Sequence, residues 1–149
     1  MIMLRKMGYY YMDERKIELC KYRFEQAKET VQVAKECFDN NHFKDAINRS
    51  YYAAFYCVRS VLALEGIDFK RHKDVISYFN KNYVANGQLD RKYGRGLGRL
   101  QQKREKSDYD DFYIVSVEET EEQIIFVNEL INEVYTRFLK DILDSRRKI

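Results

Sequence analysis

One long, nearly uninterrupted apolar and aromatic run, residues 48–64, sets the strongest limit on how this chain folds. Within it only Arg49 and Arg59 carry a charge. On a helical wheel its apolar residues cover more than half of the circumference, which is typical of a helix packed on several sides. We therefore expect a central helix, ended by Gly66, around which the other helices pack. A narrower wedge is predicted to face solvent or a partner: Asn48, Arg49, Tyr52, Arg59 and Ser60.

The rest of the chain also favours helix, because its 149 residues include no proline and only 6 glycines. Apolar residues spaced by three and four predict further helices at 13–40, 72–84, 90–106 and 116–144, with a loop at 107–115. Long helices with short connections predict an all-α, mostly antiparallel up-down bundle of about five helices. Residues 13–144 would form this bundle, between an N-terminal tail (1–12) and a basic C-terminal fringe (145–149).

Several classes of protein are excluded or disfavoured by composition. No apolar run is long enough to span a membrane, and the first residues lack the pattern of a signal peptide, so we expect a cytoplasmic protein without membrane contact. The three cysteines are widely spaced and form no Cys-x-x-Cys motif, so we expect no metal site and no disulfide framework. We expect no cofactor either, because the Gly94-x-Gly96-x-Gly98 run lies inside a predicted helix and fits no nucleotide-binding loop.

The predicted helix 90–106 is strongly basic. Arg91, Arg95, Arg99 and Lys103 are four residues apart and would form one cationic stripe along the helix. Such a stripe is either a solvated face or a surface for nucleic acid, and the two interpretations are about equally supported. The net charge of +3 permits a nucleic-acid partner without arguing for one.

Arg104 differs from this stripe because it continues the apolar spacing of Tyr93, Leu97 and Leu100. An inward-pointing arginine needs acceptors. Asp108 and Tyr109, in the predicted loop, can turn back to meet it, either as a structural pair or as part of a catalytic site.

His42 and His72 are the two histidines of the chain, and His42 is expected in an exposed turn. His72 is either a surface residue at a helix start or a polar member of a site near the basic residues, and nothing in the sequence brings it close to Arg104.

Three segments together resemble the HEPN domain family: residues 49–56 (Arg-Ser-Tyr-Tyr-Ala-Ala-Phe-Tyr), residues 66–76, and Arg104-x-x-x-Asp108-Tyr109. The resemblance covers nearly the whole chain. It implies a five-helix bundle that commonly dimerises and often accompanies a nucleotidyltransferase, as a toxin–antitoxin or stress-response pair. Many members bind RNA or nucleotides, or cleave RNA without a metal.

The family's ribonucleases resemble one another in an arginine followed four to six residues later by a histidine, in a cleft at the dimer interface. Arg104 fits the arginine, but the residue five positions on is Tyr109. Tyrosine, with a pKa of about 10, is a poor base near neutral pH. Whether the chain is an enzyme therefore stays open.

We predict a homodimeric HEPN-type protein that binds RNA or a nucleotide together with a nucleotidyltransferase partner. Two alternatives remain: a metal-independent endoribonuclease that uses Arg104 and Tyr109, and a helical module that binds only proteins. The candidate catalytic residues are Arg104, Asp108 and Tyr109. The candidate residues for binding nucleic acid or nucleotide are Arg49, Tyr52, Arg59, His72, Arg95, Arg99 and Lys103.

Overall fold

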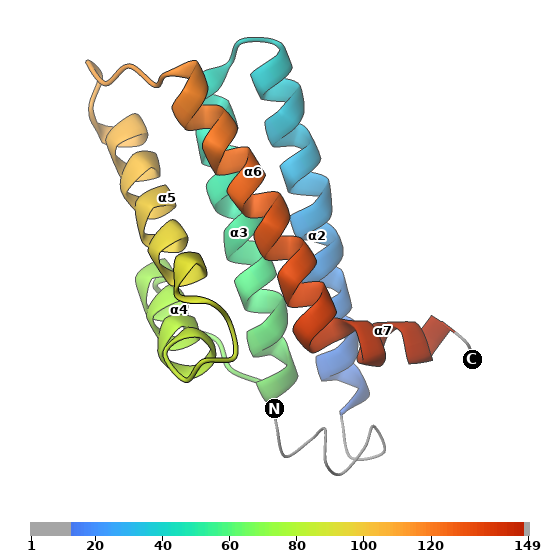
Figure 1. Ribbon diagram of the computed structural model, residues 1–149. Helices are drawn as coiled ribbons and strands as arrows, with labels where there is room; N and C mark the ends of the chain where they lie inside the picture. Colours follow the sequence, from blue (N-terminus) through green and yellow to red (C-terminus); the bar gives the residue numbers. More distant parts are fainter. Residues whose placement is uncertain (1–12, 148–149) are drawn as a thin grey trace.

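The computed structural model describes residues 13–147, and within this range the chain forms helices and no strand. In Figure 1 the long helices lie alongside one another with alternating direction, and the short helix that begins at His72 lies near one end of the group. The predicted all-α, up-down bundle is therefore confirmed; the predicted tail at 1–12 lies outside the described residues. The elements are α2 (Glu14–Asp39), α3 (Phe43–Glu65), α4 (His72–Phe79), α5 (Arg91–Tyr109), α6 (Val117–Val134) and α7 (Lys140–Arg147), with π-helical turns η2 (Asn80–Val84) and η3 (Tyr135–Leu139).

Polar side chains begin three of the long helices where the sequence predicts a start. The side chain of Asp13 accepts a hydrogen bond from the Arg15 amide, that of Asp90 from the Lys92 amide, and that of Ser116 from the Glu119 amide. Each satisfies an amide that the first helical turn leaves unpaired. At the other end of α3, Gly66 has a φ of 70°, the left-handed conformation predicted for a glycine cap.

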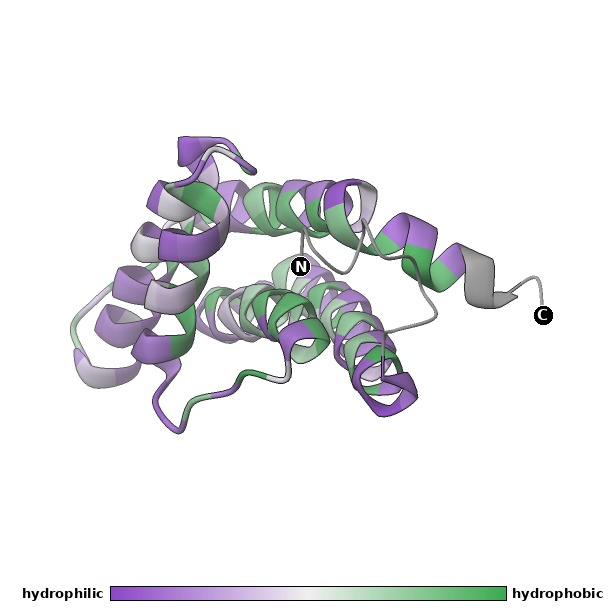
Figure 2. Ribbon diagram, turned by 90° about the horizontal axis from the view of Figure 1, so that it is seen from below, coloured by the Kyte–Doolittle hydropathy of each residue, from purple (hydrophilic) through white to green (hydrophobic). Residues whose placement is uncertain are grey.

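The centre of the bundle is α3, as its apolar run predicts. It contacts α2, α4, α5 and α6, and its buried residues extend from Ala46 to Leu64. Figure 2 shows hydrophobic residues on the sides of the helices that face one another and hydrophilic residues on the outer sides. Ser60 is a correction to the predicted wedge: it is fully buried, and its hydroxyl donates to the Cys57 carbonyl oxygen.

Two helices end later than predicted. α5 continues to Tyr109, three residues past the expected end, because no glycine or proline interrupts it before Asp110. The last predicted helix is bent rather than straight: α6 leads into the π-helical turn η3, and α7 leaves the direction of α6 there (Figure 1). α7 reaches Arg147, so the start of the predicted basic fringe is helical. No helix in the described part of the chain has the length and hydropathy needed to cross a membrane.

Candidate functional site

Tyr51 lies where α3 meets the start of α4 and the second half of α5. The spacing in the sequence predicts Tyr51 on an apolar face, and its side chain is 1% exposed. A buried tyrosine hydroxyl needs a polar partner. It finds one in His72, the first residue of α4, whose Nδ1 lies 3.2 Å from the hydroxyl oxygen.

Arg104 lies against the same tyrosine. Its guanidinium carbon is 4.4 Å from the centre of the Tyr51 ring and 6.0 Å from that of Tyr52, within the range of cation–π attraction. Its side chain is 16% exposed, and its Nε is buried without a hydrogen-bond partner among the described residues. The predicted inward direction of Arg104 is therefore confirmed.

Asp108 pairs with Arg104, but not in the predicted manner. Because α5 continues to Tyr109, the two residues lie one helical turn apart on the same helix, and no loop turns back. The Arg104 Nη1 is 3.3 Å from the Asp108 Oδ2. The Asp108 side chain is 33% exposed, so this pair resembles surface i,i+4 pairs, which contribute about 0.3–0.5 kcal/mol.

His72 completes this group, and sequence spacing does not reveal that Tyr51 joins it to Arg104. Its ring centre lies 4.0 Å from that of Phe55. Burial, and then the positive charges of Arg104 and Arg59, hold the pKa of His72 below its usual value near 6.5. His72 is therefore neutral at pH 7. We call Tyr51, Tyr52, His72 and Arg104 the Arg104 site.

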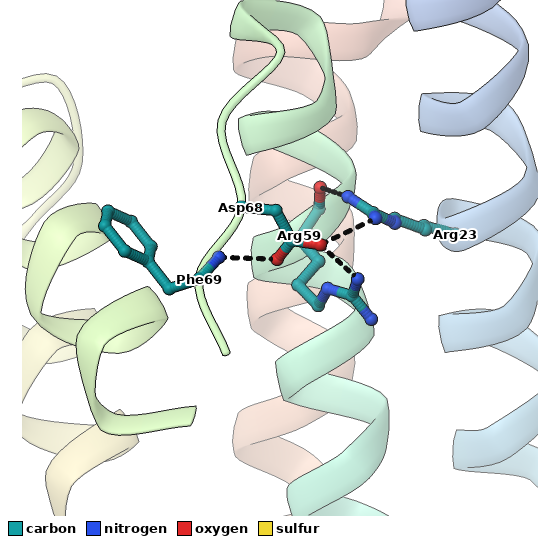
Figure 3. Close-up of polar contacts among 4 residues, drawn as sticks. All are labelled: Arg23, Arg59, Asp68 and Phe69. Atoms are coloured by element: carbon teal, nitrogen blue, oxygen red, sulfur yellow. Dashed lines mark hydrogen bonds and ion pairs between the residues drawn. The ribbon is translucent and has the colours of Figure 1, made fainter. Parts of the chain in front are cut away.

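Arg59 extends this region along α3 to a second charged cluster, drawn in Figure 3. Its guanidinium carbon is 5.6 Å from the centre of the Phe55 ring, and its Nη2 is 2.6 Å from the Asp68 Oδ2. The same carboxylate oxygen accepts from Arg23 of α2 at 3.2 Å, and the Asp68 Oδ1 accepts from the Phe69 amide. Two arginines and one backbone amide thus fix the connection between α3 and α4, four residues before His72.

The pKa of Asp68 reflects this cluster. Burial alone would raise it, but the hydrogen bonds from Arg59 and the Phe69 amide, with the charges of Arg59 and Arg23, bring it below its usual range. Asp68 is therefore ionised at neutral pH. Arg23 is 8% exposed and also donates to the Arg59 carbonyl oxygen, so the cluster joins two helices and a loop.

The remaining predicted residues lie apart from the Arg104 site or face solvent. Arg49, Arg95 and Arg99 are exposed. Lys103 is half-buried and reaches across to Glu119 of α6, with 3.6 Å between Nζ and Oε1. Tyr109 is the last residue of α5 and is 81% exposed. No group of three or more His, Cys, Asp or Glu side chains within residues 13–147 is placed to hold a metal ion.

Comparison with known proteins adds the family. A model of the HEPN domain matches residues 20–140. The chain belongs to the HEPN domain family. A protein of Methanocaldococcus jannaschii named "Putative toxin" is 33% identical over 80% of this chain and 87% of its own length. A "UPF0332 protein" of Thermotoga maritima is 32% identical over 63% of this chain and 71% of its own, and a second "Putative toxin" of M. jannaschii is 27% identical over 65% and 66%.

Two features of this HEPN domain were beyond sequence reasoning. Tyr51 has the same spacing as ordinary core residues, so nothing marks it as the link between Arg104 and His72. Arg23 and Asp68 form the charged cluster without having been singled out. A signal for Arg23 exists: it lies between Cys20 and Phe24 of the apolar stripe of α2, where an arginine must find a buried acceptor.

Proposed function

We propose that this HEPN protein is a toxin-type protein that binds RNA, or a nucleotide, through the Arg104 site. The observation that carries the proposal is the stacking of Arg104 on Tyr51, in a side chain that is still 16% exposed. Arginine on an aromatic platform is a frequent ligand for phosphate oxygens, because its planar donors match their geometry. Tyr52 is only partly buried and offers an aromatic edge for a base. Relatives named as toxins support the biological role.

Metal-independent RNA cleavage is the second candidate, and the neutral His72 favours it over the pairing of Arg104 with Tyr109. In the tautomer in which Nδ1–H donates to the Tyr51 hydroxyl oxygen, Nε2 keeps a lone pair and can accept a proton. His72 would take the proton of a ribose 2′-hydroxyl, whose oxygen then bonds to the adjacent phosphorus. The 5′-oxygen leaves with a proton from solvent, and Arg104 stabilises the added charge on the phosphate.

The proposal includes two partners. A nucleotidyltransferase is expected because the family resemblance implies such pairs and because a toxin requires a protein that controls it. A second copy of the chain is expected because the resemblance implies dimers. Three large apolar side chains at 81%, 93% and 87% exposure (Tyr109, Phe112 and Ile114) support an interface beside α5.

RNA binding and cleavage by purified variants test the proposal. We expect Arg104→Ala to lose most RNA affinity, while Arg15→Ala, which removes a 93% exposed arginine of α2, binds as the parent does. Labelled RNA incubated in chelator separates the candidates: products ending in a 2′,3′-cyclic phosphate that disappear in His72→Ala identify cleavage. Intact RNA that stays bound identifies a binding protein. If Arg104→Ala retains full affinity, or the parent binds no RNA or nucleotide, the proposal fails in favour of a protein-binding module.

A further inference from the structure

The second half of α5 forms a basic pocket on a different side from the Arg104 site. This pocket, of about 200 Å³, lies between α5, the segment that follows it and the start of α6. We call it the α5 pocket. Its lining residues are Arg99, Gln102, Lys103, Lys106, Tyr113 and Glu119.

A connected set of hydrogen bonds builds the wall opposite α5. The Tyr113 hydroxyl donates to the Glu119 Oε2 at 3.0 Å, and the Glu119 amide donates to the Ser116 Oγ at 3.0 Å. Glu119 Oε1 in turn holds the Lys103 Nζ at 3.6 Å. The pKa of Glu119 lies below its usual value, chiefly because the Tyr113 hydroxyl donates to its carboxylate. Burial acts in the opposite direction, and the positive charge of Lys103 lowers the pKa further. Ser116 caps α6 but Glu119 does not return the bond as a capping box would, because its carboxylate serves this wall.

The charges of the α5 pocket do not cancel. Arg99, Lys103 and Lys106 carry three positive charges, and Glu119 carries one negative charge. The amide of Gln102 adds a neutral donor and acceptor beside them. Because Glu119 already engages Lys103, an incoming anion would meet Arg99 and Lys106, both of which are exposed.

The predicted cationic stripe therefore consists of two unlike halves. Arg91 and Arg95 are exposed on the outer face of α5 and line no part of the pocket. Arg99 and Lys103 join Lys106 in a concave site with an aromatic wall. The α5 pocket is also separate from the Arg104 site, because Lys103 reaches α6 whereas Arg104 packs on Tyr51 of α3.

We infer that the α5 pocket is a second phosphate-binding site, which holds a phosphodiester of the RNA whose neighbouring part occupies the Arg104 site. This inference rests on the proposed function. The ligand class is a phosphate with exposed oxygens: the Arg99 fork and the Lys106 ammonium supply its charged donors, and Gln102 supplies a neutral one. Because the charged side chains of the lining are three cations and one carboxylate, a phosphate fits its chemistry better than a neutral base.

The first test compares two double variants of equal charge on the same helix. Arg99→Ala with Lys106→Ala removes the free cations of the pocket; Arg91→Ala with Arg95→Ala removes two cations outside it. For single-stranded RNA each neutralised phosphate contributes about 0.7 to the slope of log affinity against log salt, so loss of the one phosphate held in the pocket should reduce the slope by about 0.7 in the pocket variant. The control variant should leave the slope close to that of the parent. Equal reductions in both variants would overturn the inference and make the stripe a uniform RNA-binding surface without a distinct pocket, and no reduction in the pocket variant would overturn it as well.

The second test does not depend on RNA. Inorganic pyrophosphate is titrated into the parent and the pocket variant while the NMR signals of the Gln102 side-chain amide and the Tyr113 ring are followed. We expect saturable shifts in the parent and none in the pocket variant. The same shifts should persist in Arg104→Ala, so loss of the proposed RNA function and loss of the pocket are distinguishable. Absence of saturation in the parent would overturn the inference.

Discussion

Tyr51 is the residue on which the candidate site depends. Its ring supports Arg104 at 4.4 Å, and its hydroxyl faces His72 at 3.2 Å, so one buried side chain sets the positions of both groups. Burial raises the pKa of Tyr51 to about 12, although the Arg104 charge acts in the opposite direction. The hydroxyl therefore stays neutral at physiological pH, and Tyr51 places no negative charge beside Arg104.

The titration of His72 offers a direct measurement at this scale. NMR titration should give His72 a pKa below the usual value of about 6.5. In Arg104→Ala the pKa should rise toward 6.5 without reaching it, because burial is the larger cause and remains. The fold favours the neutral form of His72, so the unfolded chain binds its proton at a higher pH than the folded one. The free energy of unfolding should therefore decrease as the pH falls from about 6.5 through the folded-state pKa of His72.

A matched control for this titration is Arg49→Ala, which removes an arginine that is exposed on α3. The pKa of His72 should be unchanged in that variant. An unchanged His72 pKa in Arg104→Ala would mean that the two side chains are not close in solution, contrary to the contact through Tyr51.

Part of the Arg104 site could be predicted from the sequence, residue by residue, and part could not. The inward direction of Arg104 follows from its spacing after Leu97 and Leu100, because helical periodicity is a local property. Its contact with Tyr51 and indirect link to His72 require three helices to meet at set angles, and no pattern within one helix encodes those angles. The pairing of Asp108 with Arg104 could be predicted from the sequence. Its position one turn along the same helix could not, because sequence signals place the end of a helix only to within a few residues.

Among the elements, α5 is unusual because it carries glycines at 94, 96 and 98 inside a regular helix. Their roles differ. A Cβ built on Gly96 would lie 2.1 Å from the Phe126 Cε1 of α6, far inside van der Waals contact. A Cβ on Gly98 would meet nothing within 4 Å. Gly96 thus permits a close approach of α5 and α6, whereas Gly98 faces open space.

These two glycines form a matched pair of alanine substitutions. Gly98→Ala should raise the free energy of unfolding by about 1 kcal/mol, the usual gain of alanine over glycine in a helix. Gly96→Ala gains the same propensity but must displace the Phe126 ring, and overpacking of this kind costs about 1–3 kcal/mol. Urea unfolding should therefore place Gly96→Ala below Gly98→Ala in stability. The reverse order would show that α6 can move away from α5 without cost.

The bend between α6 and α7 belongs to the same scale and was not predicted. Neither proline nor glycine occurs between Val117 and Arg147, so the sequence carries none of the usual signals for a kink. The π-helical turn at Tyr135–Leu139 provides it instead, and the Tyr135 hydroxyl bonds across the turn to the Asp144 Oδ1 at 2.6 Å. No single residue of this stretch therefore signals the turn in the sequence.

At the scale of the whole molecule, the all-α architecture was predictable because amphipathic stripes, caps and turns agree along the chain. The apolar surface of the central helix, in contrast, gives no argument for a dimer. The excess of apolar surface on α3 is covered by α2, α4, α5 and α6 within one chain. A dimer therefore needs another surface, and the exposed side chains of Phe112 and Ile114 offer one. The spacing of apolar residues could not predict this surface, because the two residues lie in a segment without helical periodicity.

Those two side chains, 93% and 87% exposed, give the last prediction. Apolar groups so exposed on the connection between α5 and α6 are typical of an interface that a partner covers. Light scattering at micromolar concentration should give the parent about twice the 18.1 kDa of one chain. Phe112→Ser with Ile114→Ser should give a monomer, and because neither side chain supports the core, that monomer should keep its helices.

The control is Ile125→Ser, at a side chain of α6 that is 51% exposed, which should leave the dimer intact. A dimer that survives the double substitution would place its interface elsewhere, and a monomeric parent would leave these side chains to the nucleotidyltransferase or another partner.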